Sequence, residues 1–313
     1  MKHLFIVNPK SGVKDVVSII EAELKEVFKD EDYEIHVTTK RDDGYDFVKE
    51  YLTNHQDDVV RIYACGGDGT MNEVANGMYG FSNAELAIYP SGSGNDFLKY
   101  YGPNAATSFK SFANLKNGIS KPIDVIKTNE RLAVNEINIG FDANVVVKQA
   151  KIKKWPLVSG KFAYDIGVLS AFLQKINSAY KITVDDEVIY EGVAVLGALM
   201  NGCCYGGGYY PAPYAKVDDG LINLCMIKDV KRRVFLGLVN DYKKGKHIYP
   251  ESKAYPYVLT AVGKKIRIEI DCDWPYSVDG EIYYTKDLVV EAIPNAIKIV
   301  LPLEIINNKL EEK

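Results

Sequence analysis

Short apolar runs alternate with helix-like spacing along the first third of the chain. Four stretches have the apolar or alternating pattern of strands: 4–7, 33–38, 59–64 and 86–89. Apolar residues three or four positions apart predict helices over 13–28, 46–52 and 71–78. Repeated strand–loop–helix units predict a parallel sheet with helices on both faces, in which ligands bind at the carboxyl ends of the strands.

The second half has a different pattern. Its strand-like stretches, punctuated by Asp-Gly, Asn-Gly and Pro, are 123–128, 131–139, 180–184, 188–197, 220–227, 265–270, 274–278 and 288–292. Helical spacing occurs only at 162–176 and 231–243. This pattern predicts a mostly antiparallel β domain, either a sandwich or a curled sheet.

A chain of 313 residues exceeds the usual size of one hydrophobic core, so we expect two domains. The change of pattern near 120–122 places the boundary there. We therefore predict an N-terminal Rossmann-like parallel α/β domain at 1–121, followed by a β-sandwich domain at 122–313. The final stretch, 297–303, can return to pack on the first domain.

Composition narrows the class of protein. The net charge of −4 disfavours nucleic acid as a partner. The five cysteines lack zinc-site spacing, so free thiols in the cytoplasm are the simplest interpretation. The N-terminus lacks the pattern of a signal peptide. The uncharged stretch 192–215 is rich in Gly and contains Pro, which predicts a strand and a loop rather than a membrane helix.

Three loops follow strands in the first domain, at 8–12, 66–70 and 90–96. Small residues there let backbone N–H groups approach a phosphate at a helix N-terminus. Asp68 and Asp96 suit such a site if they hold Mg²⁺ against the phosphates. Each loop taken alone is typical of an ordinary turn between strand and helix. The spacing matches neither the Walker A motif nor GxGxxG.

In this order, N-P-K-S-G, G-G-D-G-T-M-N-E and P-S-G-S-G-N-D-F resemble the catalytic domain of diacylglycerol kinases. That family also holds sphingosine, ceramide and bacterial lipid kinases. The resemblance continues over nearly the whole chain, at 161–164, 206–221, 245–247 and 279–281.

The resemblance implies an ATP site. Its residues would be Asn8, Pro9, Lys10, Ser11, Gly12, Thr38, Gly66, Gly67, Asp68, Gly69, Thr70, Met71, Asn72, Glu73 and Ser93. Ser93 stands where the family has Thr, which keeps the hydroxyl. Thr39 remains an alternative to Thr38.

The resemblance also implies catalytic roles. Glu281 would be the general base for the lipid hydroxyl, and Asp68 and Asp96 would organise Mg²⁺. Asp124 would join this carboxylate network or have a structural role. A second, structural Mg²⁺ would lie at Lys216, Asp219 and Leu221. Without the resemblance, the segments 218–220 and 279–281 are both typical of plain turns.

These inferences predict an ATP- and Mg²⁺-dependent lipid kinase. The expected lipid substrate is diacylglycerol, and the expected product is phosphatidic acid. Lys148–Lys161, which includes Trp155, and a second basic cluster around 231–246 predict peripheral contact with an anionic membrane. A solvated loop before a core helix is the alternative for 148–161. Relatives also suggest a homodimer. The competing functions are a kinase of a soluble metabolite such as NAD, and a catalytically silent nucleotide- or lipid-binding regulator.

Overall fold

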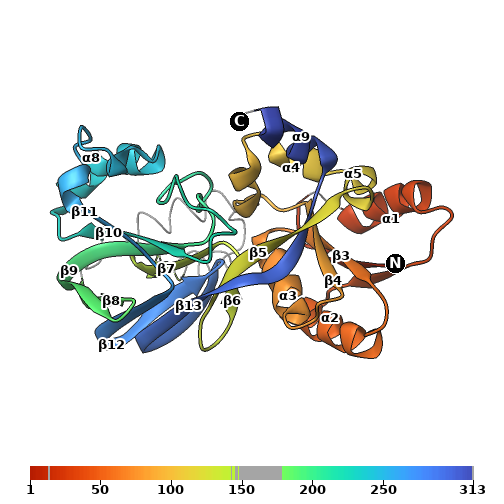
Figure 1. Cartoon of the computed structure of the whole chain (residues 1–313), viewed down its shortest axis with the longest axis horizontal. Coiled ribbons are helices and arrows are strands. Elements are labelled where there is room, and N and C mark those ends of the chain that lie inside the picture. The colour runs from red at the N-terminus through yellow and green to blue at the C-terminus, as the bar shows by residue number, and fades with distance from the viewer. Residues whose placement is uncertain (13–14, 142, 145–146, 148–177, 312–313) are drawn as a thin grey trace. The chain divides into compact units, whose positions relative to one another are not determined.

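The computed structural model describes residues 1–12, 15–141, 143–144, 147 and 178–311 (Figure 1). It divides into two compact units. The first contains Met1–Val125 and Pro294–Lys313, and the second contains Ile126–Ile293. The basic stretch 148–161, the motif at 161–164 and the helix expected at 162–176 lie outside the described residues.

The first unit contains a parallel sheet in the order β2, β1, β3, β4 and the end of β13. These strands are β1 (Lys2–Val7), β2 (Tyr33–Val37), β3 (Val60–Gly66), β4 (Ala84–Pro90) and β13 (Glu281–Leu301). All residues of β3 are buried, which explains why its sequence is apolar except for Arg61. The predicted Rossmann-like parallel α/β fold is confirmed for this unit.

Helices cover both faces of this sheet (Figure 1). On one face α2 (Asp43–Asn54) packs on α3 (Asp68–Met78), and on the other α1 (Val16–Val27) packs on α5 (Phe112–Lys116). Three further helical segments belong to the unit: η1 (Phe97–Tyr101), α4 (Ala105–Phe109) and α9 (Leu303–Glu311). Stacked Phe5 and Tyr63 lie in the core between the sheet and α1.

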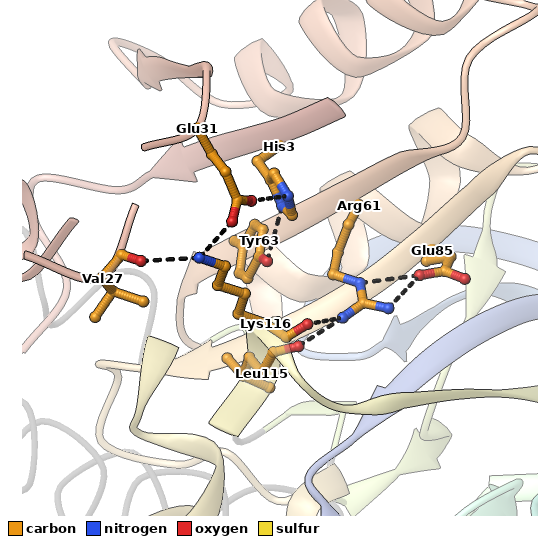
Figure 2. Close-up of polar contacts among 8 residues, drawn as sticks. All are labelled: His3, Val27, Glu31, Arg61, Tyr63, Glu85, Leu115 and Lys116. Atoms are coloured by element: carbon orange, nitrogen blue, oxygen red, sulfur yellow. Dashed lines mark hydrogen bonds and ion pairs between the residues drawn. The ribbon is translucent and has the colours of Figure 1, made fainter. Parts of the chain in front are cut away.

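A polar network lies among the aromatic rings near the amino ends of these strands (Figure 2). The buried Arg61 guanidinium binds Glu85 and donates to the carbonyl oxygens of Leu115 and Lys116 at the end of α5. These bonds satisfy carbonyl groups that a helix end leaves without an intrahelical partner. The network therefore fixes α5 to β3 and β4, at the opposite end of the strands from the predicted ligand site.

The second unit is built from antiparallel strands. They are the end of β5 (Ile119–Lys127), β6 (Leu132–Ala133), β7 (Glu136–Gly140), β8 (Ser178–Val184), β9 (Glu187–Met200), β10 (Ile222–Lys228), β11 (Val258–Gly263), β12 (Lys265–Val278) and the start of β13. Both β7 and β8 pair with both β9 and β12, so the sheet curls and closes on itself. The predicted antiparallel β domain is confirmed.

One core of this unit includes Ile137, Ile182, Leu199 and Ile266. The other core lies where α8 (Arg232–Lys243) packs on β10 (Figure 1). The short helices η2 (Lys246–Ile248) and η3 (Tyr255–Tyr257) follow α8. Within the part of the chain that the structure describes, no helix is long and apolar enough to cross a bilayer.

Several strand predictions differ from the structure. The stretch 131–139 is divided into β6 and β7, and 288–292 is only part of the long strand β13. The stretches 265–270 and 274–278 form a single strand, β12, whose pairing with β13 shifts register between Glu269 and Trp274. The polar residues between the stretches are accommodated in this irregular part of the ladder, which hides its continuity in the sequence. The sequence reasoning also missed β11, a partly exposed strand at the edge of the sheet.

Candidate active site

Three loops of the first unit meet at the carboxyl ends of adjacent strands. The β1, β3 and β4 strands are parallel and paired, with Val7 beside Cys65 and Gly66 beside Pro90. The loops that follow these strands therefore start at the same edge of the sheet. Hydrogen bonds between the loops make this edge one connected site.

The loop after β1 is tied to both other loops. The Asn8 side-chain amide donates to the Thr70 hydroxyl at 3.2 Å, and the hydroxyls of Ser11 and Ser91 lie 2.7 Å apart. Gly12 has a φ of 75°, and a Cβ there would overlap the carbonyl oxygen of Ser91. Glycine is thus required both by its backbone conformation and by the neighbouring loop. Pro9 and Lys10 are exposed beside these contacts.

The loop after β3 leads directly into α3, and Gly67 is its N-cap. A Cβ on Gly92 would lie 2.5 Å from the Cα of Gly67, so the backbones of two loops touch where neither has a side chain. Gly69 is exposed in the first turn of α3. The N–H groups and the dipole at this helix start favour an anion.

Buried side chains of α3 support this helix start from within. Thr70, Met71 and Asn72 are buried. Asn72 accepts hydrogen bonds from Asn76 through its backbone and side-chain oxygens. Met71 packs in the core, so it contributes to the site through the backbone that it holds in place.

The two predicted metal-binding carboxylates lie close together. The Asp96 backbone N–H donates to Oδ1 of Asp68 at 2.9 Å. A Cβ on Gly94 would lie 2.7 Å from Oδ2 of Asp68 and 3.9 Å from Oδ2 of Asp96, so one oxygen of each carboxylate faces this glycine. Asp96 also forms an ion pair with Lys99. Ser93 is exposed in the same loop.

Thr38 and Thr39 follow β2 and have different hydrogen-bond partners. Asp43 accepts from the backbone N–H of Thr39 at 2.6 Å and from its hydroxyl at 2.9 Å. The Thr39 N–H bond is the main cause of a lowered pKa at Asp43. The hydroxyl of Thr38 makes only a long contact, 3.5 Å, with the carbonyl oxygen of Val7. Thr38 therefore keeps more hydrogen-bonding capacity for a ligand than Thr39.

Glu73 occupies a structural position. Its carboxylate accepts from the backbone N–H groups of Asp42 and Gly44 at 3.0 and 3.1 Å, at the start of α2. A carboxylate at a helix N-terminus satisfies N–H groups that lack intrahelical partners. Glu73 thus connects α3 to α2 beside the site.

Asp124 is also tied to the backbone. It is 1% exposed and accepts from the Asn295 backbone N–H at 2.8 Å. Asn295 has a φ of 51° in β13, where the chain re-enters the first unit. This geometry supports the structural alternative for Asp124.

In the second unit, Asp279-Gly280-Glu281 forms the hairpin between β12 and β13. Asp279 and Gly280 have φ values of 46° and 90°, as in a type I′ turn. The Asp279 carboxylate accepts from the backbone N–H groups of Val134, Asn135 and Glu136 at 2.7–3.0 Å. Asp279 therefore fixes the turn, and Glu281 begins β13 as a half-buried side chain.

The predicted second metal site lies in the glycine-rich loop of this unit. The backbone N–H of Leu221 donates to Oδ1 of Asp219 at 3.1 Å, and Lys216 and Asp219 are exposed. The described residues contain no cluster of three or more His, Cys, Asp or Glu side chains arranged around a metal position. A site here would depend on backbone carbonyl groups and water.

Buried His247 anchors the same loop. Its Nε2 lies 3.0 Å from the Pro211 carbonyl oxygen and 3.4 Å from the Sγ of Cys225 on β10. Burial lowers the pKa of His247. The neutral imidazole therefore donates from Nε2 to Pro211 and fixes the loop to the sheet.

The structure thus brings together the predicted residues of the first three loops. Sequence reasoning missed two side chains among them, Ser91 and Lys99. The signals available were the position of Ser91 in the Pro-Ser-Gly-Ser-Gly motif and the spacing of three residues between Asp96 and Lys99.

Comparisons with known proteins match both parts of the chain to protein families. Residues 2–128 match the family described as "Diacylglycerol kinase catalytic domain", and residues 135–301 match "YegS C-terminal NAD kinase beta sandwich-like domain". A curated protein from Shewanella frigidimarina (strain NCIMB 400), "Probable lipid kinase YegS-like", is 29% identical over 86% of this chain and 84% of its own.

Solved structures with the same architecture come from Bacillus anthracis str. Sterne. Two of them, each described as "a putative diacylglycerol kinase", have TM-scores of 0.73 and 0.72 at 26% and 28% identity. Each comparison covers 97% of this chain, and 97% and 98% of the respective structures. The chain therefore belongs to the family in which a diacylglycerol kinase catalytic domain is followed by a YegS-type C-terminal domain.

Proposed function

We propose that the protein is an ATP- and Mg²⁺-dependent lipid kinase that converts diacylglycerol to phosphatidic acid. The observation that carries the proposal is the junction of three strand-end loops in the first unit, with Asp68 hydrogen-bonded to the loop of Asp96. Family membership and relatives named as lipid kinases support the same reaction.

The three loops would bind the ATP phosphates. Because Gly67 and Gly92 have no side chains, a phosphate group could approach the backbone closely at these positions. The start of α3 presents N–H groups to the negative charge of a phosphate. The hydroxyls of Ser11, Thr70 and Ser93 would add donors, and Thr38 would contact the nucleotide. In phosphoryl transfer, such positioning and charge neutralisation supply most of the catalysis.

Asp68 and Asp96 are suited to hold Mg²⁺. This ion uses one or two carboxylates together with phosphate oxygens and water rather than a cage of protein ligands. The donor set here fits, because one oxygen of each carboxylate faces Gly94. Bound Mg²⁺ would neutralise charge on the phosphates. Lys99 would balance the charge of Asp96.

Glu281 would act as the general base for the lipid hydroxyl. A carboxylate can accept the proton of the attacking oxygen if its position is fixed. The hairpin supports this role, because Asp279, two positions before Glu281, is fixed by three hydrogen bonds from backbone N–H groups to its carboxylate. Asp279 is then a positioning residue. Lys216, Asp219 and Leu221 would hold a structural Mg²⁺.

The proposal is tested by incubating the purified full-length protein with γ-labelled ATP, Mg²⁺ and mixed micelles containing one candidate acceptor at a time. Diacylglycerol, sphingosine, phosphatidylglycerol and a polyprenol would be compared, with NAD as a soluble acceptor. We expect label in phosphatidic acid. Transfer only to another lipid would change the substrate, transfer only to NAD would favour the soluble-metabolite kinase, and no transfer with retained ATP binding would favour a silent regulator.

A further inference from the structure

The outer face of α8 is basic and carries an exposed leucine. Alternate turns of the helix bury Phe235, Leu238 and Tyr242 against the sheet. The opposite face consists of exposed residues only: Arg232, Arg233, Leu236, Gly237, Asn240 and Lys243. Leu236 is 59% exposed near the middle of this face, with cations towards both ends. The helix is therefore amphipathic, with one apolar face packed on the core. Its polar outer face also carries one apolar side chain, Leu236.

Four exposed tyrosines lie in the segments that follow α8 or contact those segments. Tyr249 follows η2, and its hydroxyl bonds that of Tyr214 from the glycine-rich loop. Tyr214 is 69% exposed, the highest value among the large apolar and aromatic side chains of the described residues. Tyr255 and Tyr257 are also exposed, in η3. We call α8 with these four tyrosines the α8 surface.

The charge on the α8 surface differs in sign from that of the whole chain. Residues 229–253 contain exposed cations at Lys231, Arg232, Arg233, Lys243, Lys244, Lys246 and Lys253. The same segment contains three acids: Asp229 and Glu251 are exposed, and half-buried Asp241 accepts a hydrogen bond from Ser252. The chain as a whole has a net charge of −4. The basic character is therefore local.

From these observations we propose that the α8 surface docks the protein on a bilayer that contains anionic phospholipids. The choice of this occupant rests on the proposed lipid kinase function, which requires access to a membrane lipid. A solvated basic helix does not need an exposed Leu236 or four exposed tyrosines, whereas an interfacial surface needs both cations and apolar groups.

Each group has a physical role at the membrane. Lysines and arginines reach phospholipid head groups with long flexible stems, and their attraction to the anionic leaflet decreases with salt. Tyrosine has an apolar ring and a polar tip, which suits the boundary between head groups and acyl chains. Leu236 would insert among the acyl chains beside the arginines.

The test measures co-sedimentation of the full-length protein with vesicles of phosphatidylcholine alone and with added phosphatidylglycerol. Wild type is expected to bind only the anionic vesicles, and less at high salt. Removing four cations should weaken that binding at least about tenfold. The substitutions in this variant are Arg232→Gln, Arg233→Gln, Lys243→Gln and Lys244→Gln.

A control variant makes the same change in net charge at exposed lysines of the same unit outside α8. Its substitutions are Lys127→Gln, Lys264→Gln, Lys265→Gln and Lys286→Gln. We expect it to bind as wild type does. A second pair separates the apolar contribution: Leu236→Ser should weaken binding severalfold, whereas Val188→Ser, at a valine that is 50% exposed on β9, should not.

Phosphorylation of a short-chain, water-soluble diacylglycerol without vesicles is measured in parallel. The α8 variants should keep this activity, because α8 carries none of the proposed catalytic residues. Absence of activity on the short-chain diacylglycerol in wild type would count against the proposed function. The vesicle measurements would still test the docking proposal independently. The docking proposal is overturned if wild type does not bind anionic vesicles, or if the α8 and control variants bind equally.

Discussion

The Asp96 backbone N–H donates a 2.9 Å hydrogen bond to Oδ1 of Asp68. This bond joins the loop after β4 to the first turn of α3, across 28 residues of sequence. One carboxylate therefore has two tasks: Oδ1 holds the neighbouring loop in place, and Oδ2 faces Gly94 at the proposed Mg²⁺ position. The two tasks can be separated experimentally because they use different oxygens.

Asp68→Asn is expected to abolish most activity and to leave the fold intact. The asparagine carbonyl can still accept from the Asp96 N–H, but its amide group has no charge for Mg²⁺ and phosphate. We expect kcat/KM to fall about 100-fold or more, with a change in unfolding free energy within about 1 kcal/mol. Steady-state kinetics and urea unfolding measure the two effects. A variant with more than half of the wild-type activity would exclude Asp68 from catalysis.

Gly94→Ala probes the same carboxylate through space. The new Cβ would lie 2.7 Å from Oδ2 of Asp68, and because that atom ends a flexible side chain, it can move without disturbing the backbone. We expect roughly a tenfold higher Mg²⁺ concentration for half-maximal activity, and little change in stability. The comparison is Gly92→Ala, where the Cβ would meet the Gly67 backbone at 2.5 Å. The Gly92→Ala variant should lose stability as well as activity. Equal losses of stability in Gly92→Ala and Gly94→Ala would contradict the conclusion that Gly94→Ala acts only on the Asp68 carboxylate.

Substitutions of Asp279 and Glu281 are expected to change different properties, stability for Asp279 and activity for Glu281. Asp279→Asn keeps a residue that tolerates a φ of 46°, but replaces an acceptor of three backbone hydrogen bonds by a group with one acceptor oxygen. We expect a loss of about 1–3 kcal/mol in unfolding free energy, because a buried N–H then faces the amide group.

Glu281→Gln is the matched variant in the same turn. We expect stability within about 0.5 kcal/mol of wild type, and activity lower by about 100-fold or more. Denaturant unfolding and kinetics on both proteins give the comparison. Full activity in Glu281→Gln would remove it as the general base, and an unchanged stability in Asp279→Asn would contradict the structural role of Asp279.

Sequence patterns predicted the parts of the site that depend on local structure. Mainly apolar runs predicted β1, β3 and β4, and small residues after each run predicted the three loops. The start of α3 was predicted at 71 but lies at Asp68. Gly and Thr are weak helix formers, whereas an acid in the first turn of a helix is favoured by the helix dipole.

Long-range contacts decided what the sequence could not reveal. Glu73 looked like a nucleotide ligand because of its motif, yet its carboxylate meets N–H groups about 30 residues earlier in the chain. Asp279 meets residues 143–145 positions away. No local pattern records such partners, because they exist only after the strands have paired.

The last prediction concerns His3 in the network of Figure 2. Its Nε2 lies 3.1 Å from Glu31, and its Nδ1 lies 3.1 Å from the Tyr63 hydroxyl. A neutral imidazole satisfies both contacts by donating from Nε2 and accepting at Nδ1. Burial lowers the pKa of His3 below its ordinary value of 6.5, despite the nearby Glu31 carboxylate.

The sign of the pH effect follows from this lowered pKa. The unfolded chain takes up a proton on His3 near pH 6.5, whereas the folded protein does not. The contribution of His3 to the free energy of unfolding is therefore fully present above that pH and decreases as the pH falls. Urea unfolding at about pH 7.5 and about pH 5.5 should show a larger loss for wild type than for His3→Gln, whose amide cannot be protonated in this range. His247, whose pKa burial also lowers, titrates in both proteins and cancels from the difference. The carboxyl of Glu31, whose pKa is lowered by the hydrogen bond from Lys116, stays ionised throughout this range. An equal loss in the two proteins would show that burial does not hold His3 neutral.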